Sequence, residues 1–262
     1  MVVLVTNDDG YMAPGLFTLY KTARKVFGNN VVFAAPDGPR SSSGMSFTFH
    51  KPLRVEKIKH EGISGFTVSG TPADCVFIAV HHMFKGKIDL VLSGINEGMN
   101  VGLETVYSSG TISAAMFAAI SNIPSIAFSK HTYSDDHDDI KYEMESTKQK
   151  LFQILNIIKK KGFPTKVDML NVNFPKKVNM KTRIMVVKTD RRVFDDIVRE
   201  KKDPRGRLYY WLYGTLRKDL DKKADIWSLM NGHITITPIQ LSVIEPERLS
   251  EAEKLFTKND LD

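Results

Sequence analysis

The stretch VVLVTNDDG, residues 2–10, decides the fold. An apolar run ends abruptly on two adjacent carboxylates, Asp8 and Asp9, and then on a glycine. A continuous rather than alternating apolar run is typical of a strand that is buried on both faces, as in a parallel sheet. Adjacent aspartates repel each other and are poor strand formers, so something should hold them at this strand end. A cation is the first candidate.

Apolar runs of the same kind recur through the first 130 residues, with helical stretches between them. The sequence predicts strands at 2–6, 31–35, 89–94 and 124–129, and helices at 16–27, 72–84 and 113–120. Such alternation of strand and helix predicts an α/β fold around a mostly parallel sheet with right-handed crossovers.

Beyond residue 130 the pattern changes. The segment 131–140 is polar and acidic, 141–161 predicts a long helix, and 167–175 and 182–189 predict two further strands. The turn DPRGR (203–207) is followed by LYYWLYG (208–214), whose aromatic alternation predicts a hairpin that projects from the sheet. A returning strand at 233–239 and a terminal helix from Glu245 complete the chain. We therefore divide it into an α/β core at 1–190 and a hairpin, strand and helix region at 191–262.

Composition excludes several classes of protein. With 262 residues and 42% hydrophobic content, the chain can bury one large core. No apolar run approaches the ~18 residues that cross a bilayer, so no membrane association is expected. The N-terminus lacks the features of a signal peptide, and the single cysteine, Cys75, fits a cytoplasmic location. The net charge of +7 is carried by interspersed bases and acids, which predicts no specific nucleic-acid binding.

Polar residues follow the predicted strands at the edge where α/β sheets bind ligands. Asp8 and Asp9 offer hard oxygens of the kind that Mg²⁺, Mn²⁺ or Ca²⁺ prefers, which predicts a metal site. The alternative is that one aspartate only caps a turn or a helix. After the second strand come three serines, 41–43, whose hydroxyls could complete a metal shell or contact a substrate. A flexible surface loop is the alternative there.

Two further segments carry groups that suit a phosphate ester. In the loop SGINEGMNVG (93–102), glycines permit close backbone approach, and the amides of Asn96 and Asn100 can ligate a metal or bind an oxyanion. In SSGTISAAMFAA (108–119), Ser109, Gly110 and Thr111 stand at the start of an Ala-rich helix. Hydroxyls and free N–H groups at a helix N-terminus form a plausible phosphate cradle. An ordinary serine or threonine N-cap is the alternative.

The order of these motifs resembles the SurE survival-protein family. The resemblance rests on TNDDG, APGL, APDGPRSSSGMS, KPLRV, SGTPADCV, DLVLSGINEGMNVG, YSSGT and IPSIAFS, with weaker echoes in LNVNFP (170–175) and ITITP (234–238). It implies a Rossmann-like core with an extended C-terminal hairpin region. It also implies homodimers or homotetramers, formed partly by exchange of C-terminal segments. One divalent cation, Mg²⁺ or Mn²⁺, would be bound at four positions: Asp8, Asp9, Ser41 and Asn96.

The function implied by this resemblance is that of a 5′-nucleotidase. We expect a metal-dependent phosphomonoesterase that hydrolyses nucleoside 5′- and 3′-monophosphates, with polyphosphate as a further substrate class. Asp8 and Asp9 would be catalytic, and either water or Asp8 would attack phosphorus. The expected phosphate-binding residues are Asn96, Ser109, Gly110 and Thr111. A non-catalytic module that binds metal and nucleotide is the alternative.

Two positions depart from the family pattern. The serine–glycine–threonine turn comes one residue late, which leaves Ser108 and Ser109 as alternatives for the phosphate contact. Glu104 stands where the family has an aspartate. The sequence does not indicate which base is preferred.

Overall fold

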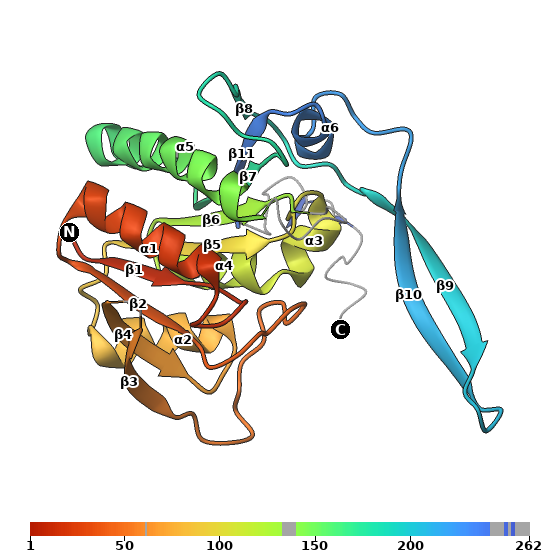
Figure 1. The fold of residues 1–262 in the computed structure, drawn as a ribbon, viewed down its shortest axis with the longest axis horizontal. Helices are drawn as coiled ribbons and strands as arrows, with labels where there is room; N and C mark the ends of the chain where they lie inside the picture. The colour runs from red at the N-terminus through yellow and green to blue at the C-terminus, as the bar shows by residue number, and fades with distance from the viewer. Residues whose placement is uncertain (61, 133–139, 242–248, 251–252, 255–262) are drawn as a thin grey trace.

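The computed structural model describes residues 1–60, 62–132, 140–241, 249–250 and 253–254. Its centre is a nine-stranded sheet in the order β3-β4-β2-β1-β5-β6-β7-β11-β8 (Figure 1). The strands of this sheet are β1 (Val3–Thr6), β2 (Val31–Pro36), β3 (Val55–His60), β4 (Ile63–Val68), β5 (Leu90–Glu97), β6 (Ser125–Lys130), β7 (Met169–Phe174), β8 (Ile184–Val186) and β11 (Ile234–Ile239).

In the described part of the chain, the strands are connected or covered by the α-helices α1 (Pro14–Phe27), α2 (Pro72–Ile78), α3 (Leu103–Ser108), α4 (Gly110–Ile120), α5 (Ile140–Lys161) and α6 (Asp225–Met230). The six strands from β4 to β7 pair in parallel, and antiparallel pairs occur only where β3 joins β4 and β11 joins β7 among the described strands of this sheet. The predicted α/β fold with a mostly parallel sheet is therefore confirmed.

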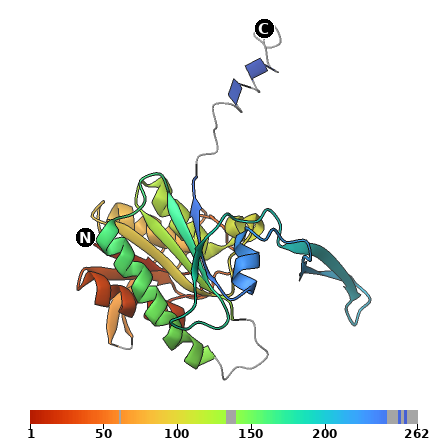
Figure 2. The ribbon, with the colours of Figure 1, turned by 90° about the horizontal axis from the view of Figure 1, so that it is seen from above.

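Helices cover both faces of the sheet, which explains the unbroken apolar run of β1. Val3 and Val5 face the core formed with α1 and α5, which lie side by side (Figure 2). Leu4 faces the opposite core, which α2 and α4 complete. Because successive strand residues point to opposite faces, a strand between two helical layers must be apolar throughout.

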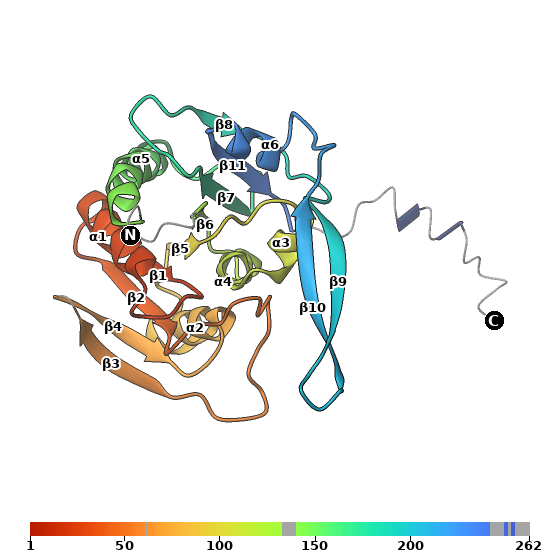
Figure 3. The ribbon, with the colours of Figure 1, turned by 45° about the vertical axis from the view of Figure 1, so that its right-hand side comes forward.

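Two strands of the C-terminal region leave the body as an arm. The strands β9 (Phe194–Lys202) and β10 (Leu208–Leu216) form an antiparallel hairpin that projects from the α/β layers (Figure 3). The hairpin predicted around 208–214 is thus confirmed. Between the arm and the chain end, β11 returns to the main sheet and lies between β7 and β8.

Some predicted segments differ from the structure or lie outside the described residues. The helix predicted at 72–84 ends at Ile78 and continues as a π-helical turn, η1 (Ala79–Met83). The acidic loop falls largely on 133–139, and the terminal helix predicted from Glu245 falls largely on 245–248, 251–252 and 255–262, all outside the described residues. No helix among the described residues is long and apolar enough to span a membrane.

Candidate functional site

The carboxyl ends of three neighbouring strands meet at the aspartate pair. Asp8 and Asp9 follow β1, and the N–H of Arg40, in the loop after β2, donates to the carbonyl of Asp8 at 2.7 Å. At the end of β5, the N–H of Glu97 donates to Oδ2 of Asp9 at 3.3 Å. The side-chain amide of Asn7 donates to the carbonyl of Gly10 at 2.9 Å and shapes the turn. The strand ends predicted to carry the site therefore lie together.

The first residues of helix α4 lie against the side chain of Asp8. The hydroxyl of Thr111 donates to Oδ1 of Asp8, and both residues are buried. A Cβ on Gly110 would lie 2.8 Å from Cβ of Asp8 and 3.0 Å from its Oδ2. Glycine is therefore required at the start of this helix if the aspartate is to keep its position.

The serine loop reaches the same point. A Cβ on Gly110 would also lie 2.8 Å from the hydroxyl oxygen of Ser43, which is buried and has no hydrogen-bond partner in the described part of the chain. The loop is fixed beside α3, because the N–H of Gly44 donates to the carbonyl of Ser108 at 2.9 Å. Ser41 is exposed and follows Arg40, whose backbone is bonded to Asp8. Sequence analysis did not single out Ser43 from the three serines.

The two serines before Gly110 have different roles. The hydroxyl oxygen of Ser109 accepts the N–H of Ile112 at 3.2 Å, so Ser109 is the N-cap of α4, the alternative we had left open. Its hydroxyl hydrogen is not used in that bond. The hydroxyl of Ser108 donates back to the carbonyl of Glu104 at 2.8 Å, within α3. Ser109 is thus the serine that stands at the start of α4.

Asn96 is oriented by its own loop. Its amide nitrogen donates to the carbonyl of Gly98 at 2.8 Å, which leaves the amide oxygen as the group available to a ligand. The loop of residues 93–102, called the glycine loop below, then crosses the sheet edge, since the N–H of Gly98 donates to the carbonyl of Lys130 at 2.8 Å. At its far end, the N–H of Gly102 donates to Oδ2 of Asp225 at 3.0 Å.

The electrostatics of the pair favour a cation. Burial raises the pKa of Asp8, against hydrogen bonds from Thr111 and from the Asp8 backbone that lower it. Burial, and then the negative charge of Asp8, raise the pKa of Asp9 to about 7. Two carboxylates that disfavour each other's charge are stabilised by a divalent cation between or beside them.

The donor set fits a hard divalent cation. Among the described residues no group of three or more His, Cys, Asp or Glu side chains could hold a metal, so neutral oxygens would have to complete the shell beside Asp8 and Asp9. The unpartnered hydroxyl of Ser43, the exposed Ser41 and the amide oxygen of Asn96 are of that kind. Carboxylate, hydroxyl and amide oxygens suit Mg²⁺ or Mn²⁺ rather than a soft metal.

Two carboxylates that sequence analysis did not identify as site residues connect the glycine loop to the arm. Asp225 is fully buried and accepts hydrogen bonds from the N–H groups of Gly102, Asp190 and Ile226 and from the hydroxyl of Thr189. No motif surrounds Asp225, so no sequence signal could have found it.

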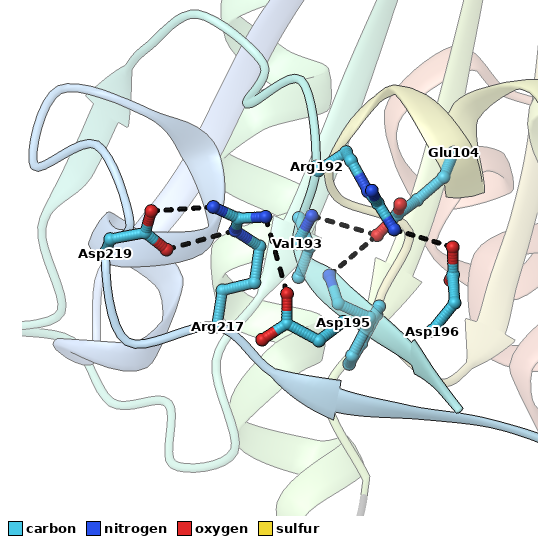
Figure 4. A network of polar contacts seen from close by, with 8 residues as sticks. Glu104, Arg192, Val193, Asp195, Asp196, Arg217 and Asp219 are labelled. Atoms are coloured by element: carbon cyan, nitrogen blue, oxygen red, sulfur yellow. Dashed lines mark hydrogen bonds and ion pairs between the residues drawn. The ribbon is translucent and has the colours of Figure 1, made fainter.

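Glu104 is the second of these carboxylates. Its Oε1 accepts the N–H groups of Val193 and Phe194, both at 2.9 Å, at the start of β9 (Figure 4). Beside it, Arg217 pairs with Asp219 at 2.6 Å and with Asp195 at 3.4 Å. The carboxylate of Glu104 thus fixes the base of the arm.

Known proteins are similar to this chain over nearly its whole length. The family described as "Survival protein SurE" matches residues 3–196. A protein of Campylobacter jejuni (strain RM1221) named 5′-nucleotidase SurE is 40% identical over 263 residues, which cover 98% of this chain and 98% of that protein. A protein of Methanocella arvoryzae with the same name is 36% identical over 263 residues, again with 98% of each chain covered. The crystal structure of the SurE protein from Aquifex aeolicus is similar with a TM-score of 0.82 and 33% identity, over 98% of this chain and 100% of that one.

Proposed function

The chain belongs to the SurE survival-protein family, and from that premise we propose that it is a 5′-nucleotidase that depends on a divalent metal. Relatives at 34–40% identity carry that name. The observation that supports the proposal most strongly is the aspartate pair at the end of β1: Asp8 is buried beneath the first turn of α4, and the half-buried Asp9 beside it has its pKa raised to about 7. A charged pair in such a place costs stability unless it binds something positive.

The residues divide into two groups in this proposal. Asp8, Asp9, Ser41 and Asn96 hold one Mg²⁺ or Mn²⁺, and Ser43 is a further hydroxyl within the same loop. When bound, the cation supplies Lewis-acid polarisation of the phosphoryl group. Ser109 and the N–H groups of Gly110 and Thr111 bind the non-bridging phosphoryl oxygens, where a helix N-terminus stabilises the charge that develops. Thr111 also holds Asp8 in place through its hydroxyl.

The substrates in this proposal are nucleoside 5′- and 3′-monophosphates, with polyphosphate as a further class. A phosphomonoester needs a site that binds one terminal phosphate, and the start of α4 offers such a site beside the aspartate pair. The net charge of +7 helps to attract anionic substrates of either kind.

Phosphate release tests the proposal. We would measure it from 5′- and 3′-monophosphates, p-nitrophenyl phosphate and polyphosphate, with Mg²⁺, Mn²⁺ or EDTA. Asp8→Asn and Asp9→Asn should abolish release, whereas Asp89→Asn should not. Asp89 is a matched control because it precedes β5 at the opposite edge of the sheet, where it accepts the N–H of Val2. Folded protein that binds Mn²⁺ and nucleotide but releases no phosphate would instead identify a non-catalytic binding module.

We further propose that the arm mediates a homodimer or homotetramer. Every residue of β10 is exposed, including Trp211 and Leu212, although a two-stranded hairpin alone is only marginally stable in water. Exposed aromatic and aliphatic side chains at this density are typical of a contact surface. Light scattering should give an oligomer for the wild type and a smaller species for Leu212→Asp, with Arg205→Asp in the turn as control. A monomeric wild type would refute this assignment.

A further inference from the structure

The weakest of the sequence motifs, LNVNFP, contains a polar pair in a strand that should be apolar. Asn171 and Asn173 lie in β7, and both are fully buried. They alternate with Leu170, Val172 and Phe174, which face the core formed with α1 and α5. Two buried amides on the other face are costly unless their hydrogen bonds are satisfied.

Both amides are satisfied by one residue of the glycine loop. Asn173 accepts the N–H of Asn100 at 2.8 Å through Oδ1 and donates to the carbonyl of the same residue at 2.9 Å through Nδ2. A side-chain amide here pairs with a single peptide unit much as a neighbouring strand would. Asn171 donates to the same carbonyl at 2.8 Å, and its own oxygen accepts from Asn173 at 3.3 Å.

The side chain of Asn100 is held as well. Its amide nitrogen donates to the hydroxyl oxygen of Ser129, at the end of β6, at 2.8 Å. Asn100 is therefore bound through its N–H, its carbonyl and its side chain, by residues from two strands far away in the sequence. We call Asn100, Ser129, Asn171 and Asn173 the asparagine clamp. All four are buried.

The clamp is connected to the proposed metal ligand Asn96 through Gly98. Asn100 is two residues from Gly98, whose carbonyl accepts the amide nitrogen of Asn96 at 2.8 Å. That bond decides which end of the Asn96 amide remains for a ligand. If the clamp is released, the chain just after Gly98 is no longer held, and the bond from the Gly98 N–H to the carbonyl of Lys130 remains. We expect the carbonyl of Gly98, and with it the amide of Asn96, to lose its fixed orientation.

We propose that Asn171 and Asn173 are positioning residues for the cation, because they clamp Asn100 and thereby orient the amide of Asn96. This inference rests on the proposed function only in so far as Asn96 is a metal ligand. It assigns a role to LNVNFP that neither the phosphate cradle nor the aspartate pair explains. Mutation of residues that orient a metal ligand by hydrogen bonds typically weakens metal affinity by about 10- to 100-fold.

Mn²⁺ affinity, measured by calorimetry in the absence of substrate, tests the clamp without relying on turnover. Asn173→Ala removes both bonds to Asn100 and should raise the Mn²⁺ dissociation constant by about 10- to 100-fold. Asn171→Ala removes only one bond to Asn100 and should raise the dissociation constant by a smaller factor. Because Asn171→Ala is the milder change, it keeps the test available if Asn173→Ala does not fold. Val172→Ala is the matched control, since it lies between them in β7 and faces the opposite core.

A purely structural role would give a different result. In that case all three variants would melt at lower temperature, while the folded fraction bound Mn²⁺ as tightly as the wild type. That outcome would overturn the inference. Kinetics give a second readout: in the clamp variants, excess Mn²⁺ should restore kcat, with KM for substrate little changed, whereas loss of folded enzyme would not respond to metal.

A double-mutant cycle tests whether the effect passes through Asn96. Asn96→Ala should weaken Mn²⁺ binding alone, and adding Asn173→Ala should then change the affinity less than twofold. Independent, additive effects would overturn the inference. The proposed function fails separately: wild-type protein that binds Mn²⁺ but releases no phosphate refutes the enzyme and leaves the clamp standing. Wild-type protein that binds no Mn²⁺ refutes both.

Discussion

Replacement of Gly110 by alanine tests how closely α4 is fitted to Asp8. At most helix positions this change stabilises a protein by about 0.5–1 kcal/mol, because alanine loses less conformational freedom than glycine on folding. Here the new Cβ would lie 2.8 Å from Cβ of Asp8 and 2.8 Å from the hydroxyl oxygen of Ser43. Carbon atoms in contact are normally about 3.5–4.0 Å apart. The carboxylate or the helix start must therefore move by about 1 Å.

A displacement of that size is large for catalysis and small for folding. Misplacement of a reacting group by about 1 Å can reduce the rate by about 100-fold, or about 2.7 kcal/mol. Alanine stabilises the helix, whereas the close contact of its Cβ with Asp8 destabilises the fold. Because these two effects oppose each other, we expect a small change in melting temperature. Gly110→Ala should therefore reduce kcat/KM by about 100-fold in protein that remains folded.

The assay is phosphate release at saturating Mn²⁺, with thermal melting measured on the same samples. Gly38→Ala is the control, because a Cβ on Gly38 meets no atom within 4 Å although Gly38 lies beside Gly10 at the same sheet edge. It should keep wild-type activity. If Gly110→Ala retained activity within threefold of the wild type, the fit between α4 and Asp8 would not matter, and the reasoning would be refuted.

Four further predictions concern charge and the base of the arm. Because the pKa of Asp9 is raised to about 7 and a cation needs the ionised form, Mn²⁺ affinity should fall about tenfold per pH unit below 7 and level off above it, as calorimetry would show. Because the pKa of Asp9 is raised, its protonated form contributes stability to the metal-free fold; this contribution is full below pH 3.8 and is lost as pH rises through 7. Mn²⁺ should therefore raise the melting temperature more at pH 8 than at pH 6. Glu104→Ala should speed amide exchange at Val193 and Phe194, whereas Glu104→Gln, which still accepts both N–H groups, should not. Asp225→Asn places an NH₂ group against the two donors of one carboxylate oxygen, either the Gly102 N–H and the Thr189 hydroxyl or the N–H groups of Asp190 and Ile226. It should cost about 1–3 kcal/mol in urea unfolding, and an unchanged midpoint would contradict this.

Local sequence patterns predicted the central strands of the sheet. The strands β3 and β4 were not predicted because they lack such a pattern. The apolar runs at β1, β2, β5 and β6 were visible because strands between two helical layers are apolar throughout. The edge strand β3 was missed because VEKIKH is mostly exposed and charged. Its neighbour β4 contains Gly65, which weakens a strand pattern but is needed here, since a Cβ would lie 2.3 Å from the ring of Phe33.

The same contrast holds for the site. Asp8 and Asp9 are adjacent in sequence, and the start of α4 carries its own N-cap pattern, so their chemistry could be predicted locally. Whether Ser41, Ser109 or Asn96 binds the ligand stays a prediction. Asn173 and Asp225 reach the glycine loop across 73 and 123 residues. Such contacts depend on strand order and register, which no local pattern determines.

The aspartate pair destabilises the metal-free fold, whereas the glycine loop next to it is held by hydrogen bonds. Burial raises the pKa values of Asp8 and Asp9, and the negative charge of Asp8 raises that of Asp9 further, so in the absence of a cation the ionised pair weakens the fold. The surrounding loop is instead tied down wherever the structure describes it: Gly98 to β6, Asn100 to β7 and Gly102 to Asp225. The pair itself is held from two sides: the hydroxyl of Thr111 donates to Oδ1 of Asp8, and the N–H of Glu97, in the glycine loop, donates to Oδ2 of Asp9. Because these contacts and the fixed loop hold the two carboxylates in place, a bound cation relieves the repulsion between them, which is the condition for tight metal binding.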